Sequence, residues 1–132
     1  MNQLVEVIKN NSSWPLVLVG VNSKIFKTAI KISAKIKDED FILFPTVNGI
    51  KTPAWVNEIK NLSSSGERCF LVLENLDEVE EKEQEKFFSL VKNRAINGYK
   101  LPSNAQILIP CQKPENISKT IIDCSIIYET KK

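Results

Sequence analysis

The stretch LVLENLDEVEEKEQEKFFSLVKNRAINGYKLPSNAQILIP, residues 71–110, has an apolar run at each end and a charged segment between them. The runs belong to CFLVL (69–73) and QILIP (106–110), and unbroken apolar runs of this length are typical of strands buried on both faces of a sheet. Between them, residues 78–94 have helical periodicity, and NGYKLP (97–102) has the composition of a turn or hairpin. The order strand, helix, strand predicts a parallel α/β unit.

The flanking sequence continues this alternation. Three further strands are expected near residues 16–20, 41–44 and 124–128, and further helices at 2–10, 24–37 and 52–62. The helix at 24–37 is predicted from Ile25, Ala29, Ile32 and Ile36, which recur every three or four residues. We therefore expect one α/β domain over residues 1–132, built as a three-layer sandwich around a mainly parallel five-stranded sheet.

This architecture gives specific expectations about the core and about the place of any site. The first strand should be central, and six strand residues should be buried. They are Val17, Val19, Phe70, Val72, Leu108 and Ile126. Because ligands bind at the carboxyl ends of parallel strands, chemistry is expected in the loops after Val19, Leu73 and Ile109.

The composition excludes several classes of function. The chain has 132 residues, a net charge of +2 and no histidine, so histidine-based catalysis and histidine metal sites are excluded. The charge is too small to indicate a nucleic-acid partner. The three cysteines, Cys69, Cys111 and Cys124, are odd in number and widely spaced, as in a reduced cytosolic protein. We see no leader and no membrane span in the sequence and expect a cytoplasmic protein without a metal.

The central stretch resembles the core of MoxR-like AAA+ ATPases, in which a strand ending in two acidic residues leads to a helix, a Gly-Tyr-x-Leu-Pro hairpin and another strand. The matching residues are Gln84, Phe87, Phe88, Leu90, Val91, Arg94, Gly98, Leu101 and Pro102. Pro53, Trp55 and Glu58 resemble a segment found upstream in some members. The resemblance implies a P-loop NTPase-like sheet in the order 5-1-4-3-2. It also implies a C-terminal helical lid, for which the sequence after the fifth strand leaves no room.

The loop that the resemblance assigns to ATP phosphates departs from the family pattern. A working loop needs glycines that let backbone amides approach phosphate, followed by Lys and Ser or Thr. Counted without gaps from Gly20, Ile25 replaces the second glycine, Phe26 the Lys and Lys27 the hydroxyl residue. A one-residue insertion would restore Lys27 and Thr28 but leave Phe26 at the glycine. In either register we expect a pocket near Gly20 to be shallow and partly filled by Ile25 or Phe26.

The family has two acidic residues where the third strand ends. In the family, an Asp holds magnesium through water and the next Glu positions the attacking water. Counting back from Gln84 places Glu74 and Asn75 at these positions, and an amide cannot accept a proton. Asp77 lies nearby and is expected to cap the following helix.

Two further functional positions follow from the resemblance. The polar sensor residue after the fourth strand would be Gln112 or Lys113, and the sequence leaves this open. The arginine finger before the last strand is replaced by Cys124. Arg94 matches a structural position and is interpreted as a helix-surface residue.

These departures predict a degenerate AAA+-like pseudo-ATPase that acts as a protein-interaction module. Its partner would be a protein, with an active AAA+ subunit as one candidate. The surfaces considered are the EVEEKEQEK helix, the 97–104 hairpin and the surroundings of Trp55. No cofactor is expected, and ATP with Mg²⁺ would bind only if the degenerate site still functions.

Two alternatives remain open from the sequence. One is a weak nucleotide binder or an ATPase completed by a partner subunit. The other is a nucleic-acid-associated protein similar to non-catalytic clamp-loader subunits. Only one feature supports it, a row of lysines on the predicted helix 24–37, namely Lys27, Lys31, Lys35 and Lys37.

Overall fold

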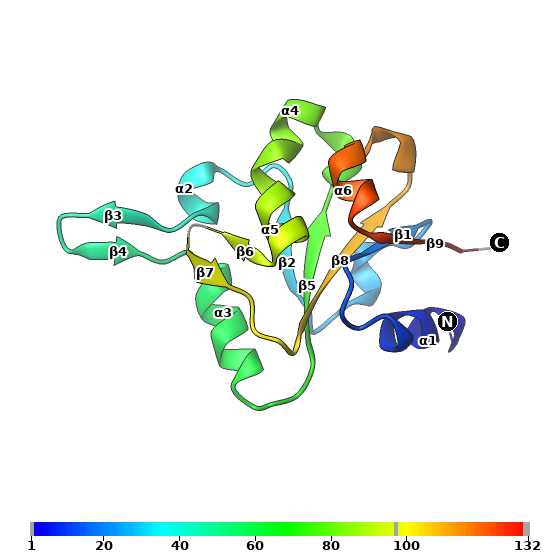
Figure 1. Cartoon of the computed structure of the whole chain (residues 1–132), viewed down its shortest axis with the longest axis horizontal. Helices are drawn as coiled ribbons and strands as arrows, with labels where there is room; N and C mark the ends of the chain where they lie inside the picture. The colour runs from blue at the N-terminus through cyan, green and yellow to red at the C-terminus, as the bar shows by residue number, and fades with distance from the viewer. Residues whose placement is uncertain (1, 97, 131–132) are drawn as a thin grey trace.

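A computed structural model describes residues 2–96 and 98–130 as a five-stranded sheet, two hairpins and several helices (Figure 1). The sheet consists of β1 (Leu16–Val19), β2 (Ile30–Ser33), β5 (Cys69–Glu74), β8 (Ala105–Cys111) and β9 (Ile126–Glu129). The hairpins are β3 (Phe44–Thr46) with β4 (Gly49–Lys51), and β6 (Ala95–Ile96) with β7 (Tyr99–Lys100). The helices are α1 (Asn2–Asn10), α2 (Asp38–Phe41), α3 (Ala54–Ser63), α4 (Glu81–Gln84), α5 (Phe88–Asn93) and α6 (Lys119–Asp123).

The sheet confirms the predicted fold class. Its order is β2-β5-β8-β1-β9, and all four pairs of neighbouring strands are parallel. Numbered along the chain, this is the predicted order 5-1-4-3-2. The first strand is internal, between β8 and β9, but the middle position belongs to β8. The expectation that the first strand is central is therefore correct only in that β1 is not at an edge.

The second strand was placed wrongly by the sequence analysis. It is formed by Ile30–Ser33, and the predicted helix 24–37 does not exist. Ile30 and Ile32 are buried while Lys31 is exposed, which is the two-residue period of a strand. Because β-branched residues favour strands and this segment pairs with the buried β5, the tertiary contact outweighs the helical spacing of the isoleucines. The row of lysines that supported a nucleic-acid partner is therefore not a helix face.

Residues 41–44 do not form the second strand either. Phe41 ends α2 and is fully buried, with its ring stacked on Trp55 at 5.8 Å between centroids. The chain then continues into the β3–β4 hairpin, which turns through Val47 and Asn48 and extends away from the rest of the molecule (Figure 1). Pro45 lacks an amide hydrogen, so this segment suits a two-stranded hairpin better than the interior of a sheet.

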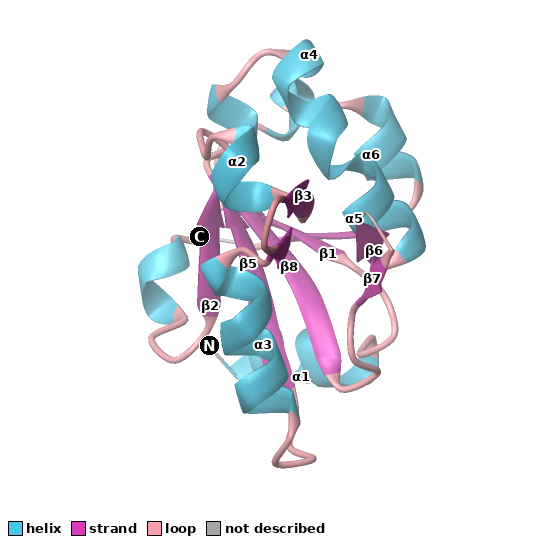
Figure 2. Ribbon diagram, turned by 90° about the vertical axis from the view of Figure 1, so that its left-hand side faces the viewer, coloured by secondary structure: helices cyan, strands magenta, loops and turns pink. Residues whose placement is uncertain are grey.

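The two faces of the sheet are covered unequally. The face that carries Val17, Leu71 and Ile107 packs against α3, α5 and α6 in the main core. The opposite face is covered by α1 and by the irregular segment 21–29. In Figure 2, α4 and α6 lie towards the top of the view, and α3 and α1 lie towards the bottom. The third layer of the sandwich is thus thin.

This difference explains which burial predictions hold. Four of the six are confirmed, namely Val17, Val19, Val72 and Leu108. Phe70 and Ile126 are only half-buried, because both face the thin layer. The last strand also begins later than predicted, since Lys119–Asp123 forms the short helix α6. Among the described residues, no helix is long and apolar enough to cross a membrane.

A buried glutamine fixes α1 to the sheet. Gln106 in β8 is fully buried, and its Nε2 donates to the carbonyl oxygens of Asn11 at 3.0 Å, Trp14 at 3.3 Å and Ile8 at 3.4 Å. Its Oε1 accepts a hydrogen bond from Arg68. The carbonyl groups at the end of a helix have no hydrogen-bond donor within that helix, and the side chain of Gln106 donates to them from the sheet.

We predict that Gln106→Leu lowers the free energy of unfolding by about 2–3 kcal/mol, because buried carbonyl groups lose their donor. Urea denaturation measures this change, and hydrogen exchange should show α1 becoming unprotected first. The control is Gln3→Leu, the same substitution at an exposed position of α1. Equal stability of the two variants would contradict the anchoring role of Gln106.

Candidate functional site

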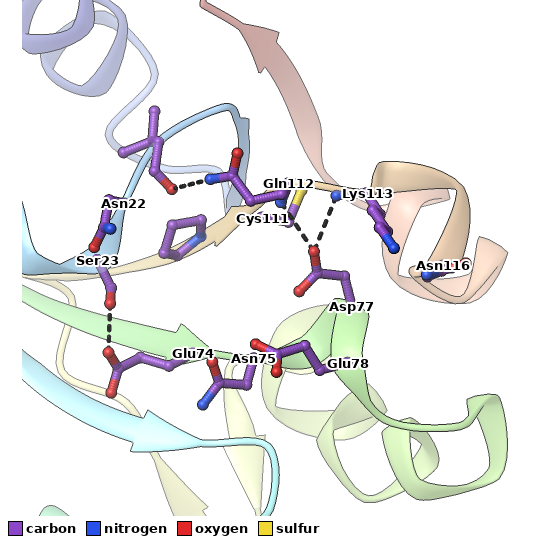
Figure 3. A pocket seen from close by; sticks show the side chains of 12 residues that line it. Asn22, Ser23, Glu74, Asn75, Asp77, Glu78, Cys111, Gln112, Lys113 and Asn116 are labelled. Carbon is purple, nitrogen blue, oxygen red and sulfur yellow. Dashed lines mark hydrogen bonds between the residues drawn. The ribbon is translucent and has the colours of Figure 1, made fainter.

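A pocket of about 620 Å³ lies where β1, β5 and β8 end (Figure 3). This is the position expected for a ligand site in a parallel sheet. The pocket is lined by Val21, Asn22, Ser23, Glu74, Asn75, Asp77, Glu78, Pro110, Cys111, Gln112, Lys113 and Asn116. Its volume is within the size range of small-molecule sites.

The loop after β1 uses its backbone amides internally. Gly20 adopts a φ of +83°, and its N–H donates to the carbonyl of Cys111 at 2.8 Å. The amide of Lys24 donates to the side chain of Asn22 at 2.9 Å. The amides of Ile25 and Phe26 donate back to Asn22 and Ser23 in a 3₁₀ turn. The amides of Gly20, Lys24, Ile25 and Phe26 are therefore engaged within the protein and cannot surround a phosphate group as the amides of a P-loop do.

Ile25 and Phe26 do not fill this pocket, contrary to the prediction. Both side chains line a separate apolar groove against α1. Lys27 and Thr28 lie in the exposed turn that precedes β2, and neither lines the pocket. Neither register of the loop thus places a lysine or a bulky side chain in the pocket.

The end of β5 contributes acidic and amide groups. Glu74 is the last residue of β5 and accepts a hydrogen bond from the hydroxyl of Ser23, which joins the ends of β5 and β1 (Figure 3). Asn75 follows in the left-handed conformation with a φ of 64°, and its amide group donates to the hydroxyl of Ser33 at 3.3 Å. The sequence analysis found Glu74 and Asn75 but missed Ser23, whose only signal was its place in the loop after the first strand.

Asp77 has a different role from the predicted helix cap. Its carboxylate accepts hydrogen bonds from the backbone amides of Gln112 and Lys113, both at 2.9 Å (Figure 3). The cap position of α4 is Glu80, which makes no side-chain cap. Asp77 therefore ties the loop after β5 to the end of β8. Such a long-range contact leaves no local signal in the sequence.

Both candidates for the sensor position line the pocket. Gln112 donates from its side-chain nitrogen to the carbonyl of Val21 at 3.3 Å, which links β8 to the loop after β1. Lys113 is the only cationic residue among those that line the pocket. The position of Gln112 matches the sequence expectation, but its amide is engaged with the backbone.

The charge of the pocket is negative. Three of the lining residues have carboxylates, Glu74, Asp77 and Glu78, against the single ammonium group of Lys113. Glu78 also pairs with Lys35 outside the pocket at 3.6 Å. Like charges a few ångströms apart repel, so this lining disfavours a polyphosphate. Among the described residues, no group of three His, Cys, Asp or Glu side chains could hold a metal ion.

Neither of the remaining candidates reaches the pocket. The thiol of Cys124 contacts the carbonyl of Ile121 in α6 at 3.3 Å. Arg94 is held by hydrogen bonds to the carbonyl groups of Pro102 at 2.8 Å and Ala105 at 2.7 Å. Arg94 thus fixes the segment after the β6–β7 hairpin, and its interpretation as a helix-surface residue is wrong. The residues that line the pocket include no arginine.

Comparison with known proteins supports the fold alone. No family model and no curated protein matches the sequence. Among solved structures, a DNA polymerase III gamma subunit-related protein from Thermotoga maritima is 8% identical, with a TM-score of 0.52 over 99% of this chain and 45% of that chain. A point mutant of RuvB from Thermotoga maritima is 12% identical, with a TM-score of 0.54 over 98% of this chain and 43% of that chain. The chain therefore shares the fold of a part of these two proteins but spans less than half of either.

The Cys111 thiol gives a test of the pocket's environment. Burial, followed by the negative charges of Asp77 and Glu115, raises the pKa of Cys111 from 9.0 to about 12. The unfolded chain therefore loses this proton at lower pH than the folded chain, so stability falls as the pH rises above about 9. Between about pH 8 and pH 10.5 we predict that this group alone costs about 2 kcal/mol.

The measurement is urea unfolding at both pH values for the wild type and for Cys111→Val. The variant should lose about 2 kcal/mol less stability over this range than the wild type. Equal losses would mean that the thiol ionises as readily in the folded protein as in the unfolded chain.

Proposed function

We propose that this chain is an AAA+-type domain of the MoxR kind that does not hydrolyse ATP and that acts by binding another protein. The observation that carries the proposal is the acidic pocket at the strand ends. Three carboxylates and one lysine line the place where the fold would accept a nucleotide. In the family, a lysine of the phosphate loop offsets the charge of the phosphates together with the magnesium ion that the acidic residues hold. Here the acidic residues line the pocket, but the loop after β1 contributes no lysine to it.

The geometry of the phosphate loop supports the same conclusion. The amides of residues 20 and 24–26 are used in internal hydrogen bonds, and Lys27 is outside the pocket. Asn75 stands where the resemblance expects the catalytic carboxylate, and an amide cannot take a proton from water. Cys124 carries no charge that could replace an arginine finger and does not line the pocket.

The residues that match the MoxR-like pattern support the fold. Gln84 is fully buried; its Nε2 donates to the carbonyl of Asn116 at 2.7 Å and its Oε1 accepts from the amide of Ser118 at 2.6 Å. Phe87 and Leu90 are fully buried in the main core. The matches thus preserve the scaffold, whereas the positions for chemistry differ. This pattern supports a domain that retains the fold of the family without its catalytic residues.

A scaffold without a nucleotide site can still bind a protein. Because AAA+ domains assemble side by side, we propose an AAA+ subunit as the partner. The three cysteines are free thiols, and thiols persist in a reducing compartment, so we place the protein in the cytoplasm. No feature of the described residues favours nucleic acid or a catalytic role.

We predict no phosphate release above background from the purified protein with Mg²⁺ and ATP. Asn75→Glu should also be inactive, because a restored carboxylate leaves the phosphate loop unchanged. The control is Asn75→Ala, which removes the side chain from the same position. Turnover by the wild type that disappears in Asn75→Ala would refute the non-catalytic assignment.

A further inference from the structure

A second cavity, on the thin face of the sheet, has the opposite character to the acidic pocket. It is a groove of about 420 Å³ between α1 and the loop that replaces the predicted helix 24–37. One wall is formed by Val5 and Ile8 of α1, the other by Ile25 and Phe26, and Phe70 of β5 lies between them. The groove exists because residues 21–29 do not form a helix across this face.

The groove is apolar and open to solvent. Val5 is 60% exposed and Ile25 is 38% exposed, although Leu4 on the same helix is buried. Single exposed apolar residues are ordinary, but two on facing walls of one groove form a continuous patch. Parallel sheets normally have helices on both faces, and among the described residues α1 is the helix that packs on this face, so the part of the face beside α1 lacks a helical cover.

The rim of the groove is positively charged. Lys9 and Arg68 are the charged residues that line it, and none of its lining residues is acidic. The guanidinium group of Arg68 lies over the ring of Phe70, 5.6 Å from its centroid. Lys31 of β2 is exposed on the same face of the sheet, since Ile30 and Ile32 point to the opposite core. A ligand that fills the groove would therefore meet cations at its edges.

We propose that this groove binds an amphipathic helix of another protein, with an apolar ridge in the groove and acidic residues beside Lys9 and Arg68. The proposal rests on the proposed function and names the surface that a protein partner uses. Helices bind such grooves through apolar residues at i, i+3 or i+4, and i+7. The bound helix would complete the third layer of the sandwich.

The most acidic segment of a second copy of this chain does not supply such a helix. This segment, Glu78–Glu85, includes α4, whose Gln84 is fully buried and bonded to Asn116 and Ser118. The adjoining Phe87 is also fully buried, so this segment has no free apolar ridge. Charge complementarity and the missing helical cover therefore both point to a different protein.

The test is selection of binders from a displayed library of peptides of about 16 residues, long enough to form a helix on binding. The wild-type chain is the target. Selected peptides should carry apolar residues at helical spacing and a net negative charge. Val5→Asp should weaken their binding at least about tenfold, because it places a carboxylate in the groove. Lys9→Glu should weaken it as well.

The matched control is Val47→Asp, the same substitution at a fully exposed position in the distant β3–β4 turn. It should leave peptide binding unchanged. The proposal is overturned if Val5→Asp and Val47→Asp bind the peptides equally, if the library gives no binder, or if the selected peptides are basic. It is also overturned if single-stranded DNA occupies the groove, or if sedimentation shows a dimer that Val5→Asp dissolves.

These outcomes are separate from the failure of the proposed function. Phosphate release by the wild type would refute the non-catalytic assignment and leave the groove result unaffected. Peptides that bind outside the groove would overturn the groove proposal and leave a protein-binding domain in place.

Discussion

The structure depends on one constraint, which is that a parallel sheet has two apolar faces and both need cover. In this chain α3, α5 and α6 cover one face, while α1 and residues 21–29 cover the other. The layer that contains α1 is fixed to the sheet because Gln106, buried in β8, donates to the carbonyl groups of Ile8 in α1 and of Asn11 and Trp14 after it. Where this cover ends, an apolar groove remains. Where the strands end, the same arrangement of β1, β5 and β8 creates the acidic pocket.

The sequence predicted the fold where the pattern was local. The buried strands and the charged helical segment are marked by their own residues, whereas the order 5-1-4-3-2 was implied by the resemblance alone. The segment 24–37 failed for a physical reason. Its isoleucines fit a helical and a two-residue period equally, and only pairing of Ile30 and Ile32 with β5 decides between them. The sequence alone does not show which strand this segment will pair with.

The candidate site shows the same limit. The resemblance placed Glu74 and Asn75 after the third predicted strand and either Gln112 or Lys113 after the fourth, and all four residues line the pocket. The prediction that Ile25 or Phe26 partly fills the pocket is wrong, because both side chains line the separate groove against α1. The sequence also did not reveal that Asp77 joins β5 to β8, since this contact spans 35 residues. Positions along strands are thus predictable, whereas the direction of loop side chains depends on the whole fold.

The loop after β1 connects the acidic pocket and the apolar groove. Its amides at residues 20 and 24–26 are hydrogen-bonded within the protein, and its residues Ile25 and Phe26 line the groove. Backbone chemical shifts of residues 20–37, measured by NMR with and without Mg²⁺ and ATP, test this most directly. We predict extended shifts for Ile30–Ser33, no helical shifts over residues 26–33, and no change on adding nucleotide. Continuous helical shifts over residues 24–37, or saturable changes at residues 20–28 with ATP, would show that the loop is a working phosphate site and would contradict the account.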